Sequence, residues 1–358
     1  MREYRNIIVN SLANLGDVVL TTSAISLLRK AYPQAKITML ARPVVSEVIK
    51  NNPVIDDVII FDYKSKQKSF RKMWEMVKEI RRRNFDLAIS FDAKLRPALL
   101  YFFAGIPVRV TGEQIFDKKP GKVSMLFTNV IKLQHDLMTS LQAETFQEIV
   151  RGFTGITGSE VPCFARIETE NAERAKILLN RLPQGKKRIG LCVKGTFALK
   201  TWPKEYFAEL VRKLYRQYDA VFFIIGAPND RAYANEVIAE IGLPVENFCG
   251  DTGLVDLAAL LSLADLFITV DTGASHIAAT TGVPMLTIFG NYNSRRWHPI
   301  SENARVLSFD PECCPCSYRE DECPYLPKPK CLYGVTPNMA LETCRELLER
   351  KSGITNDQ

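Results

Sequence analysis

Short apolar runs alternate with segments of helical periodicity along most of this chain, and that alternation restricts its fold more than any single residue does. In the first half, the apolar runs lie at 6–11, 36–41, 57–61 and 86–91. A helix is predicted at about 17–32, and a long basic helix precedes the last run. Because a helix crosses between neighbouring strands in parallel βαβ units, this order is typical of an α/β protein with a parallel sheet.

A second series of the same kind follows an interruption. Its apolar runs lie at 188–193, 220–226, 245–249, 266–270 and 284–290. Between 151 and 167, three glycines and a proline break the periodicity, as in an interdomain linker. A chain of 358 residues also exceeds the usual size of one hydrophobic core.

We therefore expect two Rossmann-like, doubly wound domains that face each other across a cleft. The first is predicted at 1–160 and the second at 161–335. Thr336 followed by Pro337 is typical of an N-cap and the first position of a helix. Residues 336–358 are therefore expected to form a C-terminal helix and tail.

The composition excludes several classes of protein. No apolar run approaches the roughly 18 to 20 residues that a membrane span needs. Asn10 and Asn14 interrupt the first apolar segment, unlike a secretory signal, so we expect a cytoplasmic protein. The net charge of +7 is too small to indicate a nucleic-acid partner, but it suits phosphorylated substrates or an anionic membrane surface.

The first predicted strand–helix junction carries Gly16 and Asp17. Ligands of open α/β sheets collect outside the carboxyl ends of the strands, so Asp17 is placed where a reacting carboxylate would lie. Alternatively, Asp17 caps the helix, since Asp at a helix start stabilises it by about 1 kcal/mol. The junction lacks GxGxxG and is therefore not a dinucleotide fingerprint.

The matching junction of the second half, VKGTFALKTWP, carries Thr196 and Lys200. A lysine in such a loop can meet a phosphate as a point charge, while a threonine hydroxyl and backbone N–H groups donate hydrogen bonds. The alternative for Lys200 is an ordinary solvated lysine.

A third junction, DTGASHIAATTGVP, follows the apolar run at 264–270. The first amides of the helix it opens would lack intrahelical partners, and the helix dipole favours an anion there. A diphosphate fits such an end, with Asp271 accepting from a sugar hydroxyl, Gly273 permitting close approach and His276 donating to phosphate. Alternatively, Asp271 caps the helix and His276 is a satisfied, semi-buried histidine.

In their order along the chain, several stretches resemble the bacterial lipopolysaccharide heptosyltransferases of glycosyltransferase family nine. They are NLGDVVLTTSAISLLRKAYPQAKITML, KGTFALKTWP, ADLFITVDTGASHIAATTGVPMLTIFGNYNSRRWHP and the cysteine-rich stretch that ends in VTP. The resemblance covers nearly the whole chain. It implies a GT-B fold, in which the N-terminal domain binds the acceptor and the C-terminal domain binds a nucleotide-sugar donor.

The resemblance also implies roles for individual residues. Asp17 matches the family's catalytic base. In the family, basic residues of the loop after the fourth strand face the acidic acceptor, and the candidates here are Arg96 and, more weakly, Lys94. The implied donor-binding residues are Thr196, Lys200, Asp271, Thr272, Gly273, His276 and, as a candidate ribose contact, Asp230. One departure concerns the acceptor side, where Gln142 stands near the place of a family histidine and His135 lies seven residues earlier.

With these roles the reaction is an inverting displacement that moves heptose from ADP-heptose to the inner core of lipopolysaccharide. Asp17 removes the acceptor proton, and Lys200, Thr196 and the amides at 272–274 meet the charge on the leaving diphosphate. No metal is expected, because the chain lacks an Asp-x-Asp pair. The expected partners are the donor and a lipid A–core acceptor, which would bring the protein to the inner face of the membrane.

Two other functions stay open from the sequence. One is a related transferase with another nucleotide-sugar and another surface-glycan acceptor, and the other is a non-catalytic nucleotide-binding module on the same fold.

Two further features have competing interpretations. The cysteine-rich stretch could hold a structural metal through Cys313, Cys316, Cys323 and Cys331, but it lacks paired CxxC spacing, which favours reduced thiols. The basic run at 64–83 carries an apolar stripe that includes Trp74, Val77 and Ile80. We expect this helix to bury its stripe on the sheet rather than to lie on a membrane, although its cations could still attract anionic lipid.

Overall fold

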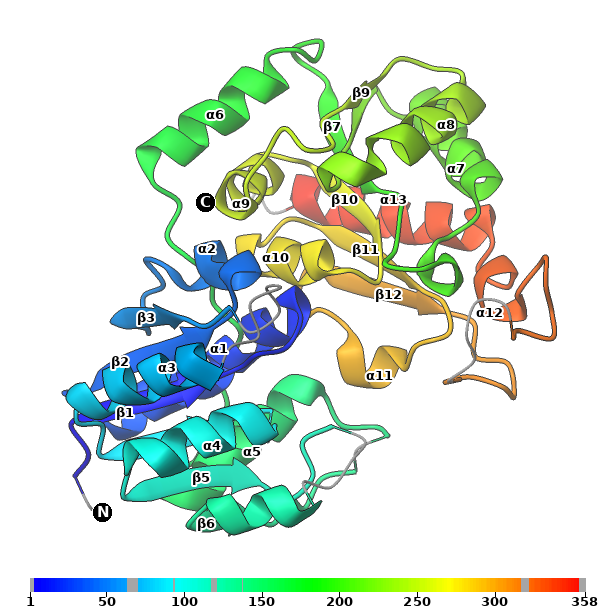
Figure 1. Ribbon diagram of the computed structural model, residues 1–358. Coiled ribbons are helices and arrows are strands. Elements are labelled where there is room, and N and C mark those ends of the chain that lie inside the picture. Colours follow the sequence, from blue (N-terminus) through cyan, green and yellow to red (C-terminus); the bar gives the residue numbers. More distant parts are fainter. Residues whose placement is uncertain are drawn as a thin grey trace. The chain divides into compact units, whose positions relative to one another are not determined.

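The computed structural model describes residues 3–62, 70–92, 94–116, 121–136, 138–316 and 322–353. The chain divides into two compact units between Arg166 and Ile167. The helices of each unit surround its own sheet (Figure 1). The predicted linker at 151–167 begins inside a helix, and the chain is extended or irregular from 156 to 166.

The first unit is built on a six-stranded sheet with the order β3-β2-β1-β4-β5-β6. The strands are β1 (Asn6–Asn10), β2 (Lys36–Ala41), β3 (Asp57–Ile60), β4 (Leu87–Ser90), β5 (Val108–Gly112) and β6 (Asn129–Ile131). All of its strand pairs are parallel. The central strands are buried along their length, which is why they appear in the sequence as continuous apolar runs.

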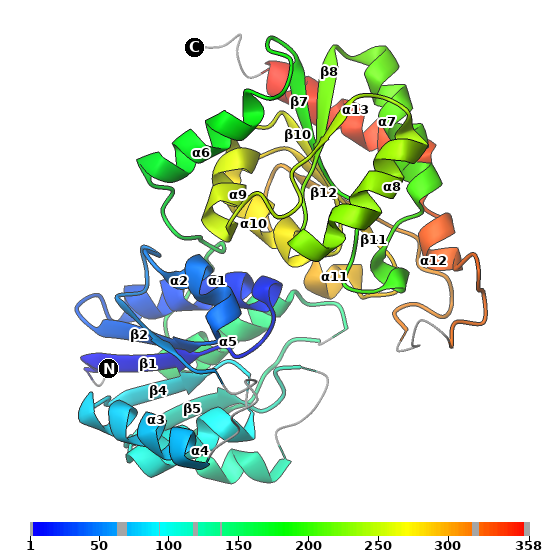
Figure 2. The same cartoon turned by 45° about the horizontal axis from the view of Figure 1, so that its top comes forward.

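Helices cover both faces of this sheet. They are α1 (Leu15–Ala31), α2 (Ser46–Ile49), α3 (Phe70–Arg82), α4 (Leu95–Ala104) and α5 (Gln142–Thr154), with short 3₁₀ turns η1 (Pro43–Val45) and η2 (Gly121–Leu126). Helices α1 and α5 pack together, as do α3 and α4. Figure 2 shows these two pairs on opposite faces of the sheet.

The second unit repeats this plan with the order β12-β11-β10-β7-β8-β9. Its strands are β7 (Lys187–Cys192), β8 (Ala220–Ile224), β9 (Val245–Asn247), β10 (Leu266–Val270), β11 (Met285–Phe289) and β12 (Ala304–Ser308). Its helices are α6 (Thr169–Leu179), α7 (Lys204–Gln217), α8 (Arg231–Ile241), α9 (Leu254–Ser262), α10 (Gly273–Thr281), α11 (Ser294–Trp297), α12 (Lys330–Tyr333) and α13 (Pro337–Gly353), with 3₁₀ turns η3 (Ala198–Lys200) and η4 (Pro228–Asp230).

Both sheets therefore have the doubly wound Rossmann order, which confirms the predicted fold class. The direction of winding reverses between β1 and β4 in the first unit and between β7 and β10 in the second. Ligands bind at such switch points, outside the carboxyl ends of the strands. The four loops that follow these strands are consequently where a site is to be sought.

Some elements depart from the sequence-based expectation. Strands β5, β6 and β12 were not predicted: β6 has three residues and is largely exposed, and every residue of β12 is only half-buried. The predicted basic helix begins at Phe70, and the part of the run at 63–69 lies outside the described residues. None of the helices in the described ranges is long and apolar enough to cross a membrane.

Candidate active site

The switch point of the second unit brings Lys200 and Asp271 together. Lys200 ends η3 in the loop after β7, and Asp271 directly follows β10. Because β7 and β10 are hydrogen-bonded neighbours, the two loops leave the sheet side by side. Lys200 Nζ lies 2.5 Å from Asp271 Oδ2, and both side chains are almost completely buried.

Two glycines allow this close approach. A Cβ on Gly195 would lie 2.6 Å from the carbonyl oxygen of Lys200, and a Cβ on Gly290 would lie 2.0 Å from that of Leu199. Backbone atoms cannot yield to such contacts, so glycine is required at both positions. The loop after β7 is thus held against the end of β11, where the N–H of Asn291 donates to the carbonyl of Leu199.

An aromatic ring completes the surroundings of Lys200. Its ammonium lies 3.7 Å from the centroid of Tyr292, which follows β11. A cation over a ring face is attracted by the ring quadrupole, by about 1 kcal/mol or more in a partly desolvated place. An ammonium group has three donors, so the pairing with Asp271 leaves donors for another acceptor.

The charges of this cluster are perturbed by burial. Desolvation raises the pKa of Asp271, and the nearby Lys200 ammonium opposes that rise. Burial lowers the pKa of His276 to about 4, with smaller contributions from Lys200 and His298. His276 is therefore neutral at physiological pH, and its Nδ1 has no hydrogen-bond partner among the described residues.

Helix α10 begins beside this cluster. Thr272 is its N-cap in extended conformation, Gly273 is its first residue, and His276 lies on its first turn. The first amides of a helix have no intrahelical acceptor and carry the positive end of its dipole. Of the predicted donor residues, Lys200, Asp271, Thr272, Gly273 and His276 thus gather in one place.

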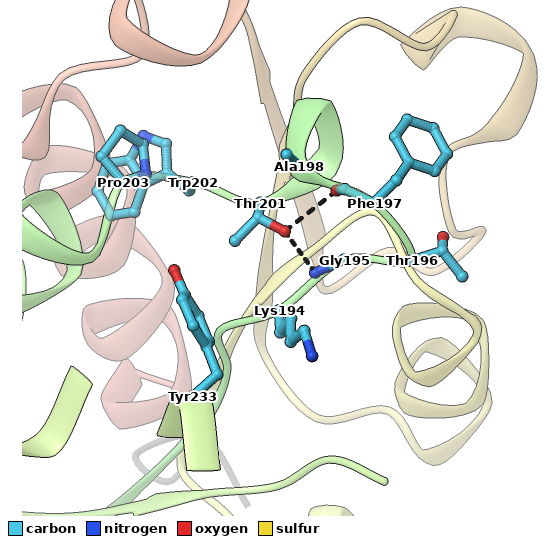
Figure 3. Close-up of a pocket in the computed structure, with 9 residues that line it drawn as sticks. All are labelled: Lys194, Gly195, Thr196, Phe197, Ala198, Thr201, Trp202, Pro203 and Tyr233. Carbon is cyan, nitrogen blue, oxygen red and sulfur yellow. Dashed lines mark hydrogen bonds between the residues drawn. The ribbon is translucent and has the colours of Figure 1, made fainter. Parts of the chain in front are cut away.

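A pocket of about 470 Å³ opens beside the loop after β7. Figure 3 shows its lining, in which the Thr201 hydroxyl accepts from the N–H of Gly195 and donates to the carbonyl of Phe197. Thr196 is exposed on this lining. At the base, Trp202 is completely buried, and its Nε1 donates to the carbonyl of Val335 over 2.9 Å.

Asp230, the candidate ribose contact, is linked to this pocket through one of its lining residues. It ends η4 after β8, where its Oδ2 accepts from the N–H of Ala227. Its Oδ1 lies 3.0 Å from Nζ of Lys194, which lines the pocket. The structure therefore ties Asp230 to the loop that carries Thr196.

The switch point of the first unit carries Asp17. It lies partly exposed in the first turn of α1, and its Oδ2 accepts from the N–H of Asn14 over 3.1 Å. The expected alternative, Asp17 as the N-cap, is wrong: Asn14 is the N-cap, and Asp17 is the third helical residue, whose side chain completes a capping box with the Asn14 backbone. This contact and a chemical role are compatible, because a capping-box carboxylate at the carboxyl edge of a sheet remains accessible to a ligand.

A buried carboxylate, Asp92, organises the loop that leads to Asp17. Asp92 follows β4 and accepts from the side-chain amide of Asn10 and from the N–H of Leu12, both over 2.8 Å. Asn10 in turn accepts from the hydroxyl of Tyr101, also over 2.8 Å. This chain of hydrogen bonds joins the ends of β1 and β4 and fixes the backbone three residues before α1.

The predicted acceptor residues differ in position. Lys94 belongs to the same network, since its Nζ donates to the carbonyl of Leu12 over 3.1 Å and lies 3.7 Å from Asp92. Arg96 is exposed in the first turn of α4. His135 contacts Glu148 and Thr145 of α5, and Gln142, buried at the start of that helix, donates to the carbonyl of Ile115.

The nine cysteines are free thiols. Burial raises the pKa of Cys331 to about 11, and Cys314, Cys316, Cys323 and Cys313 contribute to its surroundings. Within the described ranges, no group of three or more His, Cys, Asp or Glu side chains is arranged to hold a metal ion.

Three features of the site escaped the sequence analysis: Tyr292, the Lys194–Asp230 ion pair and the Asp92 network. Each follows a strand at its carboxyl end, which is the one signal that could have found them. Asp92 was overlooked beside the more conspicuous cations Lys94 and Arg96.

Comparison with known proteins agrees with this arrangement. A family model described as glycosyltransferase family 9 (heptosyltransferase) matches residues 73–326. The chain is 24% identical over 306 residues to lipopolysaccharide heptosyltransferase 2 of Escherichia coli K12, covering 82% of this chain and 85% of that protein.

Solved structures give the same result for the fold. A glycosyl transferase family 9 structure from Veillonella parvula superposes with a TM-score of 0.84 at 24% identity, covering 98% of this chain and 99% of that chain. The E. coli ADP-heptose lipopolysaccharide heptosyltransferase II superposes with a TM-score of 0.76 at 20% identity, covering 97% and 99%.

Two Rossmann-like units, each with a polar cluster at its switch point, are the parts of a GT-B glycosyltransferase. The chain belongs to glycosyltransferase family 9, the heptosyltransferase family. It is therefore an enzyme that transfers a glycosyl group, and the predicted family, fold and enzyme class are confirmed.

Proposed function

We propose that this enzyme transfers heptose from ADP-heptose to the inner core of lipopolysaccharide. Relatives named as lipopolysaccharide heptosyltransferases support the acceptor, and the structural neighbour named for ADP-heptose supports the donor. The observation that carries the proposal is the cluster of Lys200, Asp271 and His276 at the start of α10.

The second unit would bind the donor. Lys200, the Thr196 hydroxyl and the first amides of α10 offer donors and positive charge to a diphosphate. His276 would act as a neutral donor, because its pKa lies well below physiological pH. Asp271 would hold Lys200 in place and accept a hydrogen bond from a hydroxyl of the nucleotide-sugar. Asp230 would accept a hydrogen bond from a ribose hydroxyl.

The first unit would activate the acceptor. Asp17 would take the proton of an acceptor hydroxyl while that oxygen forms a bond to the anomeric carbon. The bond from the anomeric carbon to the diphosphate breaks, its electron pair remains on the phosphate oxygen, and the configuration inverts. Arg96 and Lys94 would attract an anionic acceptor, and Asp92 would position the loop that leads to Asp17.

The proposed reaction needs no metal, because Lys200 and the first amides of α10 would stabilise the negative charge on the leaving diphosphate. The enzyme would work on the cytoplasmic side of the membrane, where its lipid-linked acceptor is exposed.

The experiment that tests this function measures transfer from ADP-heptose to heptose-deficient lipopolysaccharide in the presence of EDTA. We expect wild-type protein to transfer heptose and Asp17→Asn to be slower by about 10²- to 10⁴-fold, because a general base contributes that much. Donor affinity should be unchanged in Asp17→Asn, since the donor binds to the other unit.

Three results would contradict parts of the proposal. Absence of transfer by wild type, with transfer from another nucleotide-sugar, would replace the donor. Equal rates in both proteins would leave Asp17 as part of the capping box only. Loss of wild-type activity in EDTA would show that a metal takes part.

A further inference from the structure

A group of exposed aromatic rings covers the outer side of α3 and α4. Trp74 on α3 is 44% exposed, and Phe102 and Phe103 on α4 are 46% and 43% exposed. The rings of Trp74 and Phe103 meet edge to face with centroids 5.6 Å apart, and those of Phe102 and Phe103 lie 5.5 Å apart. The three rings therefore form one continuous apolar surface.

Two other exposed apolar side chains lie on α4 and on η2, which packs against it. Leu95 lies two turns before Phe102 on the same side of α4, and Met125 of η2, which packs against α4, is among the most exposed hydrophobic residues. We call these five residues, Trp74, Leu95, Phe102, Phe103 and Met125, the aromatic surface. Contiguous exposed apolar surface is uncommon on a soluble domain and marks an interaction site.

Only one side of α3, the helix that carries Trp74, packs into the core of the first unit. Val77 and Ile80 are buried in the core of the first unit, and Met73 and Met76 pack against it. The predicted burial of the stripe is thus confirmed at Val77 and Ile80, whereas Trp74 is exposed and meets Phe103. The core does not require an aromatic side chain at this position.

Cations surround the aromatic surface. Helix α3 has five basic and two acidic residues, and α4 has no acidic residue at all. Arg81 donates from Nη2 to the carbonyl of Phe103, and the guanidinium of Arg109 lies 5.5 Å from the centroid of Phe102. Lys72, Lys78 and Lys122 are exposed nearby on α3 and η2.

The combination of exposed Trp and Phe with Lys and Arg fits one kind of partner, a bilayer with anionic headgroups. Aromatic rings enter the headgroup region, and each nearby cation adds about 1 kcal/mol of attraction to an anionic surface. A second copy of the chain fits less well, because a two-fold contact places identical surfaces opposite each other and would oppose like charges.

We propose that the aromatic surface of α3 and α4 docks this enzyme on anionic membrane. This adds to the proposed function a place where the first unit meets the lipid that carries its acceptor. It goes beyond the transfer chemistry, because docking needs neither donor nor acceptor.

The test is co-sedimentation of the full chain with vesicles. One set contains phosphatidylcholine alone, and the other contains phosphatidylglycerol in phosphatidylcholine. We expect binding to the anionic vesicles only, and a loss of binding as salt is added. The double variant Phe102→Ser/Phe103→Ser should bind about tenfold less, because two interfacial rings are lost. Lys72→Glu/Lys78→Glu should show a similar loss.

Matched controls separate docking from folding and from catalysis. Ile177→Ser removes an exposed apolar side chain from α6 of the second unit and should bind as wild type does. Asp17→Asn should also bind normally, so failure of the proposed chemistry leaves the docking result unaffected. The Phe102→Ser/Phe103→Ser variant should still unfold cooperatively at a temperature well above that of the binding assay, since both side chains are only partly buried.

Three outcomes would overturn the proposal. Wild type could fail to bind anionic vesicles, or Phe102→Ser/Phe103→Ser could bind as tightly as wild type. The third outcome is a wild-type dimer in light scattering that the double variant loses, which would assign the aromatic surface to a second copy of the chain.

Discussion

The two units share one strand order but use their switch points in opposite ways. In the first unit, the buried carboxylate of Asp92 is saturated by hydrogen bonds from its own surroundings, including Asn10 and the N–H of Leu12. In the second unit, the buried carboxylate of Asp271 depends on Lys200, and Nδ1 of the neighbouring His276 has no hydrogen-bond partner in the part of the chain that the structure describes. The first arrangement holds a loop in place, whereas the second leaves polar atoms ready for a ligand.

The difference shows that strand order determines where a site lies in the fold but does not determine its chemistry. Both loops leave neighbouring strands at the same point of the same sheet order. The chemistry depends on whether the buried charge is already satisfied, because an unsatisfied polar group in a buried place costs free energy until a ligand pairs with it.

The largest expected effect comes from breaking the pair in the second unit. Lys200→Met should reduce stability by about 3–5 kcal/mol and abolish donor binding, because it leaves the buried Asp271 without its cation. Adding Asp271→Asn to that variant should restore stability but not donor affinity. Denaturant unfolding and calorimetric titration with the donor nucleotide measure the two quantities.

Lys194→Met is the matched control for Lys200→Met. Its ion pair with Asp230 is partly exposed, so we expect a stability loss below about 1 kcal/mol. Equal losses of stability in Lys194→Met and Lys200→Met would contradict the importance of burial in this comparison.

An intermediate effect is expected in the first unit. Asp92→Asn should reduce stability by about 2–3 kcal/mol. The new side-chain NH₂ group would face the N–H of Leu12, which donates to the carboxylate in wild type, and two donors cannot pair. We expect kcat to fall while donor affinity stays constant, since the shifted loop leads to Asp17 and the proposed donor site lies in the second unit.

Asp86 provides a control at the opposite edge of the same sheet. It accepts from the N–H groups of Arg5 and Asn6, much as Asp92 accepts from that of Leu12. Asp86→Asn should lower stability but preserve kcat of the folded enzyme. A similar loss of kcat in both variants would show that Asp92 acts through general stability and not through the loop.

The smallest effect concerns pH. The folded-state pKa of His276, about 4, lies below its unfolded value of about 6.5, so between these values the unfolded chain binds a proton that the folded chain does not. Stability contributed by the neutral His276 is therefore present above about pH 6.5 and is lost as pH falls towards 4.

Comparison of wild type with His276→Gln isolates this contribution, because His298 is retained in both. Between about pH 7 and about pH 5, wild type should lose on the order of 1 to 2 kcal/mol more stability than the variant. Identical pH dependence in the two proteins would mean that His276 is charged or solvated in the folded state.

Sequence reasoning succeeded where periodicity was strong. The buried strands β1, β4, β7 and β10 appear as continuous apolar runs, and their carboxyl ends predicted where Lys200, Asp271 and His276 would gather. Strands β6 and β12 gave no such signal, because short or half-exposed strands lack a continuous apolar run.

Partner assignments within the site could not be predicted. The pairing of Lys200 with Asp271 depends on β7 and β10 being neighbours in the sheet. The sequence of neither loop reveals that strand order. The same holds for Tyr292, whose contact with Lys200 comes from the close approach that Gly290 permits. The resemblance to a family pointed to Lys200 and Asp271 separately but not to their ion pair.

The hydrogen bond from Trp202 to Val335 has a consequence for the timing of folding during synthesis. Trp202 lines the pocket, and its indole N–H donates to the carbonyl of Val335, two residues before α13 begins. Domains emerge from the ribosome and fold in order from the N-terminal end. The first unit can therefore complete its core while the second is still being made, but the hydrogen bond that fixes Trp202 forms only after residue 335 has been synthesised.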